Sequence, residues 1–388
     1  MKKVTRNANY TKRYNRNQVL RMLIEAPISR ADLAKRTGLT PQAISNIVSS
    51  LQEEGLIKET MDSVPKMGRP PIYLELSDNI PIAVGIYLSR IECQIGIVNL
   101  DGKCIARENV DYDKKMTAHD KINMMISTIK NLLKKNGCGN EVLGIGICTP
   151  GPVDKQLGKI LKPTDFEGWE NIDIVSPFEK ELKLHTSVEN NAYAVASFEK
   201  NYGNGKGIDN FILCVVDSGI GCGVISNGRL FRGSHFLSGE IGHVTIDMNG
   251  EKCSCGNIGC LEHYASTQNL LKRNGYQPDQ WFLLTKQAID GDKKALSIIN
   301  QQAEYIVAGL ISAVNMFDPE AVVLNGDILD VFDLIQQKIS KELNERVISR
   351  HFGKIKILPS SREENHSVVV AANIIFDEYL SSGGIESK

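Results

Sequence analysis

The 388-residue sequence lacks several features that would place it in a special class of proteins. No run approaches the roughly 18 apolar residues of a membrane span, and the N-terminal stretch MKKVTRNANYTKR has no apolar segment of the kind that a signal peptide needs. Prolines number only 13, and with 42% hydrophobic and 23% charged residues the composition excludes a disordered or fibrous chain. We therefore expect a folded, cytoplasmic protein that does not associate with membranes.

Acidic residues are missing from the first 21 positions, which hold seven Lys or Arg residues. Residues 1–75 contain 13 Lys or Arg against 7 Asp or Glu (net +6), and the rest of the chain contains 32 against 39 (net -7). The whole-chain charge of -1 therefore conceals a basic N-terminal module. A polyanion such as DNA is the first candidate partner of this module, and charge alone leaves a solvated basic tail as the alternative.

Three helical patterns follow the basic start. Residues 17–25 place apolar side chains on one face, and a second helix begins at Ser29, whose hydroxyl can cap it. A third helix opens with Thr40 as the N-cap and Pro41 in the first turn, and it ends near residue 54. Three short helices in this order predict a helix-turn-helix.

The third helix has a polar face suited to reading base edges. Gln42, Ser45 and Asn46 lie opposite an apolar stripe, and Gln and Asn can pair bidentately with adenine in the major groove. Two extended segments then flank a turn rich in Lys, Gly and Pro, which predicts a wing whose Arg69 would suit a narrow A·T-rich minor groove. An interdomain linker is the alternative for that turn. The candidate DNA-binding residues are Thr40, Pro41, Gln42, Ser45, Asn46 and Arg69.

From residue 80 onward, apolar strands alternate with helical segments, which predicts an α/β architecture. The first group of strands recurs near residue 211, so we expect two related lobes with a ligand crevice at the strand ends. The predicted domains are a winged helix over residues 1–76 and a body over 77–388, with lobes of approximately 77–190 and 191–388.

A cluster of cysteines is the most specific local motif. Cys253, Cys255 and Cys260 form C-x-C-x4-C, and His243 lies ten residues before the first of them. Three thiolates and an imidazole are the ligands of a closed structural zinc site, and a reducing cytoplasm favours metal over a disulfide. A disulfide or free thiols are the alternatives. With every position filled by protein, the zinc would have no catalytic role.

These motifs resemble a known family. GEIGH followed by CxCGxxGCLE is similar to the signature of the ROK family (repressors, open reading frames and sugar kinases). The similarity covers nearly everything from residue 80 and includes GIGICTPGPVD at 144–154, VENNA at 188–192, DSGIGCGV at 217–224 and DPEAVVLNG at 318–326. The resemblance implies a two-lobed actin-like fold. With a winged helix in front, the chain resembles the repressor branch of the family.

The resemblance also implies a sugar site. Carboxylates, an amide and a zinc-bound imidazole are suited to binding sugar hydroxyls. By position in the family motifs, the sugar-binding residues would be Gly151, Asn190, Asn191, Glu240, His243 and Glu262.

Two departures from the kinase branch argue against phosphoryl transfer. The position of the catalytic Asp is occupied by Asn191, whose amide cannot accept a proton. The first phosphate loop carries Tyr87, Leu88 and Arg90 in place of an Asp-x-Gly-x-Thr segment. We therefore expect a protein that is not an enzyme.

The expected function is that of a transcriptional repressor of a carbohydrate utilisation operon, such as one for xylose metabolism. It would bind an A·T-rich palindromic operator as a homodimer or homotetramer, because two recognition helices reading half-sites require two-fold symmetry. A sugar or sugar phosphate would be the effector, closing the lobes and lowering operator affinity. The alternatives are an active hexose kinase with a retained DNA-binding module, and a repressor controlled by a protein partner.

Overall fold

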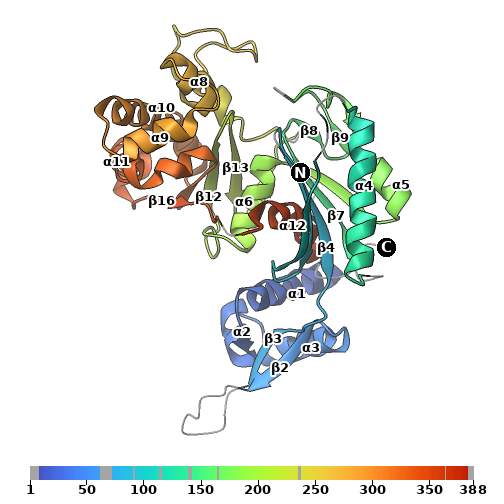
Figure 1. The fold of residues 1–388 in the computed structure, drawn as a ribbon. Helices are drawn as coiled ribbons and strands as arrows, with labels where there is room; N and C mark the ends of the chain where they lie inside the picture. The colour runs from blue at the N-terminus through green and yellow to red at the C-terminus, as the bar shows by residue number, and fades with distance from the viewer. Residues whose placement is uncertain are drawn as a thin grey trace. The chain divides into compact units, whose positions relative to one another are not determined.

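In a computed structural model the chain divides into two units, and Figure 1 shows their helices and strands, with labels on many of them. The structure describes residues 8–382 apart from 62–71, 91, 112, 114–115, 139–141, 164–165, 235–236 and 363. Unit 1 comprises Met1–Asn190 and Glu364–Lys388, and unit 2 comprises Asn191–Glu363. Among the described residues, no helix combines the length and the apolar character that crossing a membrane requires.

Unit 1 begins with a small domain of three helices and a three-stranded sheet. Its elements are α1 (Ala8–Glu25), β1 (Ile28–Ser29), α2 (Arg30–Thr37), α3 (Pro41–Glu53), β2 (Ile57–Met61) and β3 (Ile72–Leu76). The Ser29 hydroxyl accepts a hydrogen bond from the Asp32 N–H at 3.1 Å, which caps α2 as predicted. Strand β3 pairs antiparallel with both β1 and β2. The predicted winged helix-turn-helix is therefore confirmed.

Two details of this domain differ from the expectation or lie outside it. Helix α1 begins at Ala8 rather than at residue 17, because polar residues of adequate helix propensity extend it beyond its apolar stripe. The turn between β2 and β3, including Arg69, lies outside the described residues.

The rest of unit 1 is an α/β lobe. Its mixed five-stranded sheet has the order β11-β7-β4-β5-β6, and a small sheet of β8, β9 and β10 follows β7 in the chain. The main-sheet strands are β4 (Ile82–Leu88), β5 (Cys93–Asn99), β6 (Cys104–Asn109), β7 (Val142–Thr149) and β11 (Thr186–Asn190). The other elements are α4 (Ala118–Lys135), β8 (Val153–Asp154), β9 (Lys159–Ile160), β10 (Ile172–Asp173), α5 (Ser176–Leu182) and α12 (His366–Ser381).

Helix α12 returns from the C-terminal end of the chain to pack on this sheet, against β4 and β7 (Figure 1). The contact is close enough to require glycine. A Cβ atom on Gly146 would lie 2.0 Å from the carbonyl oxygen of Ala371, and one on Gly85 would lie 2.0 Å from that of Val368. The structure therefore assigns Glu364–Lys388 to unit 1, which differs from the predicted second lobe of approximately 191–388.

Unit 2 is a second α/β lobe, with sheet order β14-β13-β12-β15-β16. Its strands are β12 (Phe211–Val216), β13 (Ile220–Ser226), β14 (Arg229–Phe231), β15 (Ala321–Asn325) and β16 (Lys356–Pro359). Its helices are α6 (Asn191–Asn201), α7 (Leu261–Ala265), α8 (Thr267–Arg273), α9 (Trp281–Ile289), α10 (Lys293–Phe317) and α11 (Phe332–Arg346). The short 3-10 helices are η1 (Ile241–His243), η2 (Asp327–Val331) and η3 (Ile348–His351).

The two sheets share one topology. In each, three antiparallel strands consecutive in the chain form one side. A later strand pairs in parallel with the first of these three, and a second later strand pairs in parallel with that one at the edge of the sheet. The strand pattern that recurs near residue 211 therefore corresponds to a second sheet of the same topology, which agrees with the expectation of two related α/β lobes.

Candidate functional site

Helix α3 presents the polar face that the sequence predicted. The Thr40 hydroxyl accepts a hydrogen bond from the Ala43 N–H at 3.2 Å, which caps the helix, and Pro41 occupies its first turn. The apolar side of the helix is buried inside the domain, at Ile44, Val48 and Leu51. On the other side, Gln42 and Asn46 are exposed, with 3.0 Å between Gln42 Nε2 and Asn46 Oδ1, and Ser45 is half-buried. Exposed amides one turn apart are available to a ligand such as DNA.

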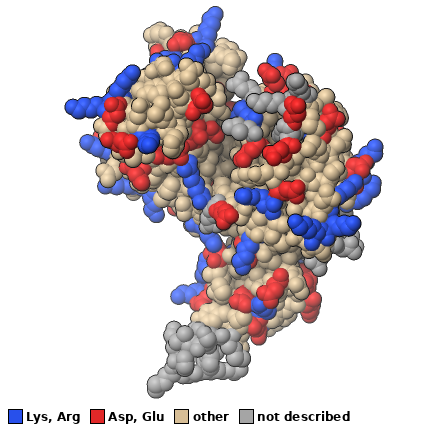
Figure 2. All heavy atoms as spheres, in the orientation of Figure 1, with Lys and Arg blue, Asp and Glu red and all other residues tan. Residues whose placement is uncertain are grey.

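Some basic side chains of this domain form ion pairs with acidic side chains of the same domain. Arg16 is buried, donates to Ser50 Oγ at 3.1 Å and forms an ion pair with Glu54, so it ties α1 to α3. Arg30 pairs with Glu59, at 2.8 Å between their side chains. On the face shown in Figure 2, acidic and basic side chains of this domain are intermixed. Arg16 therefore does not belong to the basic surface that its place among the first 21 residues had suggested.

Two of the predicted sugar-binding residues meet in unit 1. Gly151 follows β7, Asn190 ends β11, and these parallel strands align Thr149 with Asn190. A Cβ atom on Gly151 would lie 3.1 Å from Asn190 Nδ2, so Gly151 keeps the backbone close to this amide. Asn191 comes next in the chain as the first residue of α6, in unit 2.

Three others come together in unit 2. The Glu262 carboxylate accepts a hydrogen bond from the Ile220 N–H at 2.8 Å, which holds it beside the loop between β12 and β13. Burial raises the pKa of Glu240; the charge of His243 acts against this shift, and that of Glu262 adds to it. Glu240, His243 and Glu262 are therefore coupled electrostatically within unit 2.

His243 also belongs to the cysteine cluster. One ligand atom from each of His243, Cys253, Cys255 and Cys260 lies within 4.8 Å of the others. His243 Nδ1 is 3.8 Å from Cys253 Sγ, and Cys255 Sγ is 3.7 Å from Cys260 Sγ. Two thiolates bound to a tetrahedral zinc ion at about 2.3 Å are themselves about 3.8 Å apart, so these spacings fit that ion.

The backbone of the cysteine loop explains how these atoms converge. Gly256 and Gly259 have φ of +96° and +63°, which glycine adopts without strain, and a Cβ atom on Gly259 would lie 1.7 Å from the Asp247 carbonyl oxygen. All nine cysteines of the chain lie in the described part and are free of disulfides. The arrangement therefore favours a metal over the disulfide alternative.

Two glycines of the DSGIGCGV motif at 217–224 have close packing contacts. A Cβ atom on Gly219 would lie 3.0 Å from Glu262 Oε2, and one on Gly223 would lie 2.5 Å from the Cβ of Ala196. In the first loop, Tyr87 is half-buried, Leu88 is buried at the end of β4, and Arg90 is exposed. Close packing accounts for both glycines without a nucleotide.

A carboxylate pair in unit 2 was not identified from the sequence. Burial, together with the charge of Asp217, raises the pKa of Asp327 to about 7, and Thr267 Oγ1 donates to Asp327 at 3.0 Å. Each Asp follows an apolar strand, in FILCVVD and in AVVLNGD, and the two strands are parallel neighbours. That shared pattern was the available signal, because parallel strands bring their carboxyl ends to one edge.

Comparisons with known proteins agree with this architecture. Residues 83–378 match the ROK family, and residues 17–64 match the MarR family. The chain is 31% identical over 378 residues to the xylose repressor of Bacillus subtilis (strain 168), covering 96% of this chain and 97% of the relative. It is 28% identical over 396 residues to the N-acetylglucosamine repressor of Escherichia coli O157:H7, covering 97% and 95%.

Solved structures separate two kinds of relative. A ROK family transcriptional regulator described as a homolog of the E. coli MLC protein superposes with a TM-score of 0.79 at 26% identity and covers 96% of this chain and 98% of its own. A ROK hexokinase from Thermus thermophilus has a TM-score of 0.66 at 25% identity and covers 76% of this chain and 98% of its own. The regulator thus spans nearly the whole chain, and the hexokinase about three quarters of it. With the ROK match covering residues 83–378, the chain belongs to the ROK family.

Proposed function

We propose that this chain is a sugar-responsive transcriptional repressor of a carbohydrate utilisation operon. The observation that carries the proposal is the combination, in one chain, of a winged helix with an exposed polar recognition face and a ROK body, matched over nearly its full length by proteins named as repressors. We place the protein in the cytoplasm, because a repressor must be in the same compartment as its operator DNA.

The proposed DNA contacts lie on α3 and the wing. Amides at Gln42 and Asn46 would read adenine in the major groove, and Arg69 would enter an A·T-rich minor groove. A homodimer or homotetramer would present two such helices to the half-sites of a palindrome. The proposed set is Thr40, Pro41, Gln42, Ser45, Asn46 and Arg69.

The proposed effector is a sugar or sugar phosphate. Hydrogen-bonding groups that both donate and accept suit a ring of hydroxyls, and the repressor relatives carry the names of xylose and N-acetylglucosamine. The proposed contacts are Gly151, Asn190, Asn191, Glu240, His243 and Glu262. A sugar lowers operator affinity only if it binds the two states of the repressor unequally.

The proposed metal is a structural zinc ion held by His243, Cys253, Cys255 and Cys260. When bound, it would fix the loop between Glu240 and Glu262. Because Nδ1 of His243 faces Cys253, the opposite edge of the imidazole, at Nε2, would remain for a sugar hydroxyl.

Phosphoryl transfer is not part of the proposal. Asn191 stands where a kinase has its catalytic base, and an amide cannot take the proton from a sugar hydroxyl. A coupled assay should show no ATP turnover with any hexose; turnover that Glu240→Ala abolishes would instead support the kinase alternative.

Selection of bound fragments from genomic DNA tests the DNA-binding part directly. We expect enrichment of an A·T-rich palindrome beside carbohydrate genes, and loss of this enrichment in Asn46→Ala. Fragments without a common sequence would contradict the assignment. Calorimetry that detects no sugar, with a protein that co-purifies and blocks DNA binding, would favour control by a partner.

A further inference from the structure

The end of helix α12 carries two adjacent carboxylates that contact different parts of unit 1. Asp377 Oδ1 lies 2.8 Å from a guanidinium nitrogen of Arg21, on helix α1 of the winged-helix domain. Glu378 Oε1 lies 2.9 Å from Nζ of Lys155, in the turn that follows β8. Two neighbouring residues of one helix thus contact the DNA-binding domain and the lobe.

The lobe side of this connection is a dense polar cluster. Besides Lys155, Glu378 accepts a hydrogen bond from Ser187 Oγ at 2.8 Å and contacts His185 Nε2 at 2.9 Å. Burial by itself would raise the pKa of Glu378, but the hydrogen bond from His185 and the charge of Lys155 outweigh it and lower that pKa to about 2. The carboxylate is therefore ionised and held by several partners at once.

The cluster reaches both segments of unit 1 that carry proposed sugar contacts. Lys155 lies four residues after Gly151, and its Nζ is also 3.6 Å from Glu189, whose side chain is buried. Ser187 and Glu189 belong to β11, the strand that ends at Asn190. A shift of the Gly151 turn relative to Asn190 would therefore change the bonds to Glu378.

Helix α12 packs so closely on the sheet that we expect it to move as a rigid element. Its backbone contacts the sheet at Gly85 and Gly146, without intervening side chains. Interiors packed at this distance transmit displacement rather than absorb it. A change of position at Glu378 would thus reach Asp377, its neighbour on the same helix.

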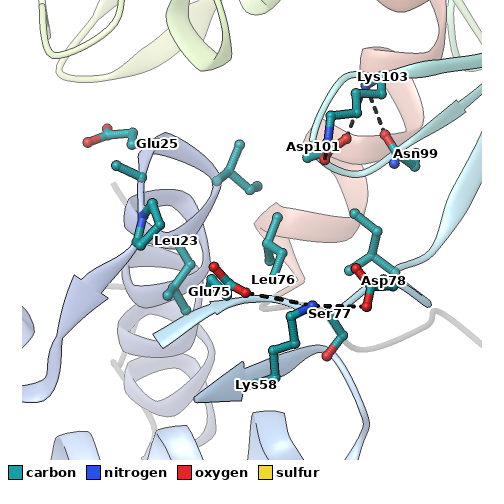
Figure 3. Close-up of a pocket in the computed structure, with 14 residues that line it drawn as sticks. Leu23, Glu25, Lys58, Glu75, Leu76, Ser77, Asp78, Asn99, Asp101 and Lys103 are labelled. Atoms are coloured by element: carbon teal, nitrogen blue, oxygen red, sulfur yellow. Dashed lines mark hydrogen bonds and ion pairs between the residues drawn. The ribbon is translucent and has the colours of Figure 1, made fainter. Parts of the chain in front are cut away.

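The junction between the winged helix and the lobe also has open space. A cavity of about 580 Å³ lies where the end of α1, strand β3 and the segment after it face the turn between β5 and β6 (Figure 3). Lys58 bridges Glu75 and Asp78 on one side of it, and Lys103 contacts Asp101 on the other (Figure 3). Room on this side means that a change at the Arg21–Asp377 pair can alter the position of α1 without a steric clash there.

We propose that Asp377 and Glu378 are positioning residues that link sugar binding to the DNA-binding domain. Glu378 responds through Lys155 to movement of the segments that carry Gly151 and Asn190, and Asp377 transmits the change to α1 through Arg21. This inference rests on the proposed function, because it requires both an operator and a sugar. The residues themselves touch neither ligand.

The test measures the coupling rather than either binding event. Calorimetry first establishes which of D-xylose, D-glucose and N-acetylglucosamine 6-phosphate binds the wild type. Operator affinity is then measured with and without a saturating amount of that sugar, on a labelled duplex from the region upstream of the protein's own gene. The ratio of the two dissociation constants is the coupling factor.

We expect Asp377→Asn and Glu378→Gln to reduce this ratio about two- to fivefold, the range that a partly exposed ion pair can supply, while the sugar affinity of the DNA-free protein stays within about twofold. The swap of Arg21→Asp with Asp377→Arg should restore the ratio that either single reversal lowers. Lys338→Gln serves as the control, because it breaks a comparable pair with Glu304 at 2.9 Å in unit 2 and should leave the ratio unchanged.

An unchanged ratio in Asp377→Asn, Glu378→Gln and both single reversals would overturn the inference while leaving the proposed function intact. Loss of operator binding in the variants without any rescue by the swap would also overturn it, because that outcome indicates a purely structural role. A wild type that binds operator DNA but none of the sugars contradicts the effector part of the proposed function, and the inference falls with it.

Discussion

The close contact between helix α12 and strand β7 allows us to predict how much a substitution at Gly146 destabilises the fold. A Cβ atom on Gly146 would lie 2.0 Å from the Ala371 carbonyl oxygen, whereas ordinary contacts begin at about 3.4 Å. The substitution Gly146→Ala therefore needs the helix and strand β7 to separate by about 1.4 Å. The opposing atom belongs to the backbone, so no change of rotamer can relieve the clash. We expect a loss of unfolding free energy at the upper end of the usual overpacking range of about 1–3 kcal/mol.

Urea unfolding measures this loss. Trp169 is buried in unit 1, and in a Trp281→Phe background it is the remaining tryptophan, so its fluorescence reports on the unit that Gly146 belongs to. The matched control is Gly221→Ala, followed by circular dichroism, because a Cβ atom on this strand glycine would meet the nearest atom at 3.7 Å. It should change the unfolding free energy by less than about 1 kcal/mol. A Gly146→Ala variant with the unfolding free energy of the wild type would refute the close contact between α12 and β7.

Three further predictions concern the proposed sites and the polar cluster. Asn46→Ala should weaken operator binding by about 1–3 kcal/mol in a gel-shift titration, with affinity for an unrelated duplex unchanged; equal weakening on both duplexes would contradict base reading. Cys255→Ser should lower the zinc content per chain, measured by atomic emission, and with it the affinity for sugar; one zinc per chain in the variant would refute the ligand set. Glu378 raises the pKa of His185, so the stability that this pair adds is complete below about pH 6.5 and is lost as the pH rises through the folded-state value. His185→Gln should therefore flatten that part of the stability profile, and an unaltered profile would show that Glu179, Glu378 and Lys155 do not act on this ring.

Local signals in the sequence predicted much of this molecule because they depend on residues close together in the chain. The caps at Ser29 and Thr40, the two faces of α3 and the spacing of the cysteine cluster are all encoded within a few turns or loops. The strand pattern that recurs near residue 211 predicted two similar lobes for the same reason.

Features that depend on distant segments were not predicted. Arg16 looked like one more residue of a basic arm, and only the packing of α1 on α3 shows that it pairs with Glu54. The return of α12 to unit 1 was missed, because an apolar helix at the end of the chain fits either lobe equally well by pattern. The pairing of Asp217 with Asp327 likewise depends on parallel strands more than a hundred residues apart.

The proposed function requires a sugar to control the affinity of this chain for DNA. Fluorescence anisotropy of the operator duplex, titrated with the full-length protein with and without saturating D-xylose, D-glucose or N-acetylglucosamine 6-phosphate, tests it most directly. We predict that one of these sugars changes the operator dissociation constant by about 5- to 150-fold, the usual range for coupled sites. One and the same dissociation constant with every sugar that calorimetry shows to bind would contradict it.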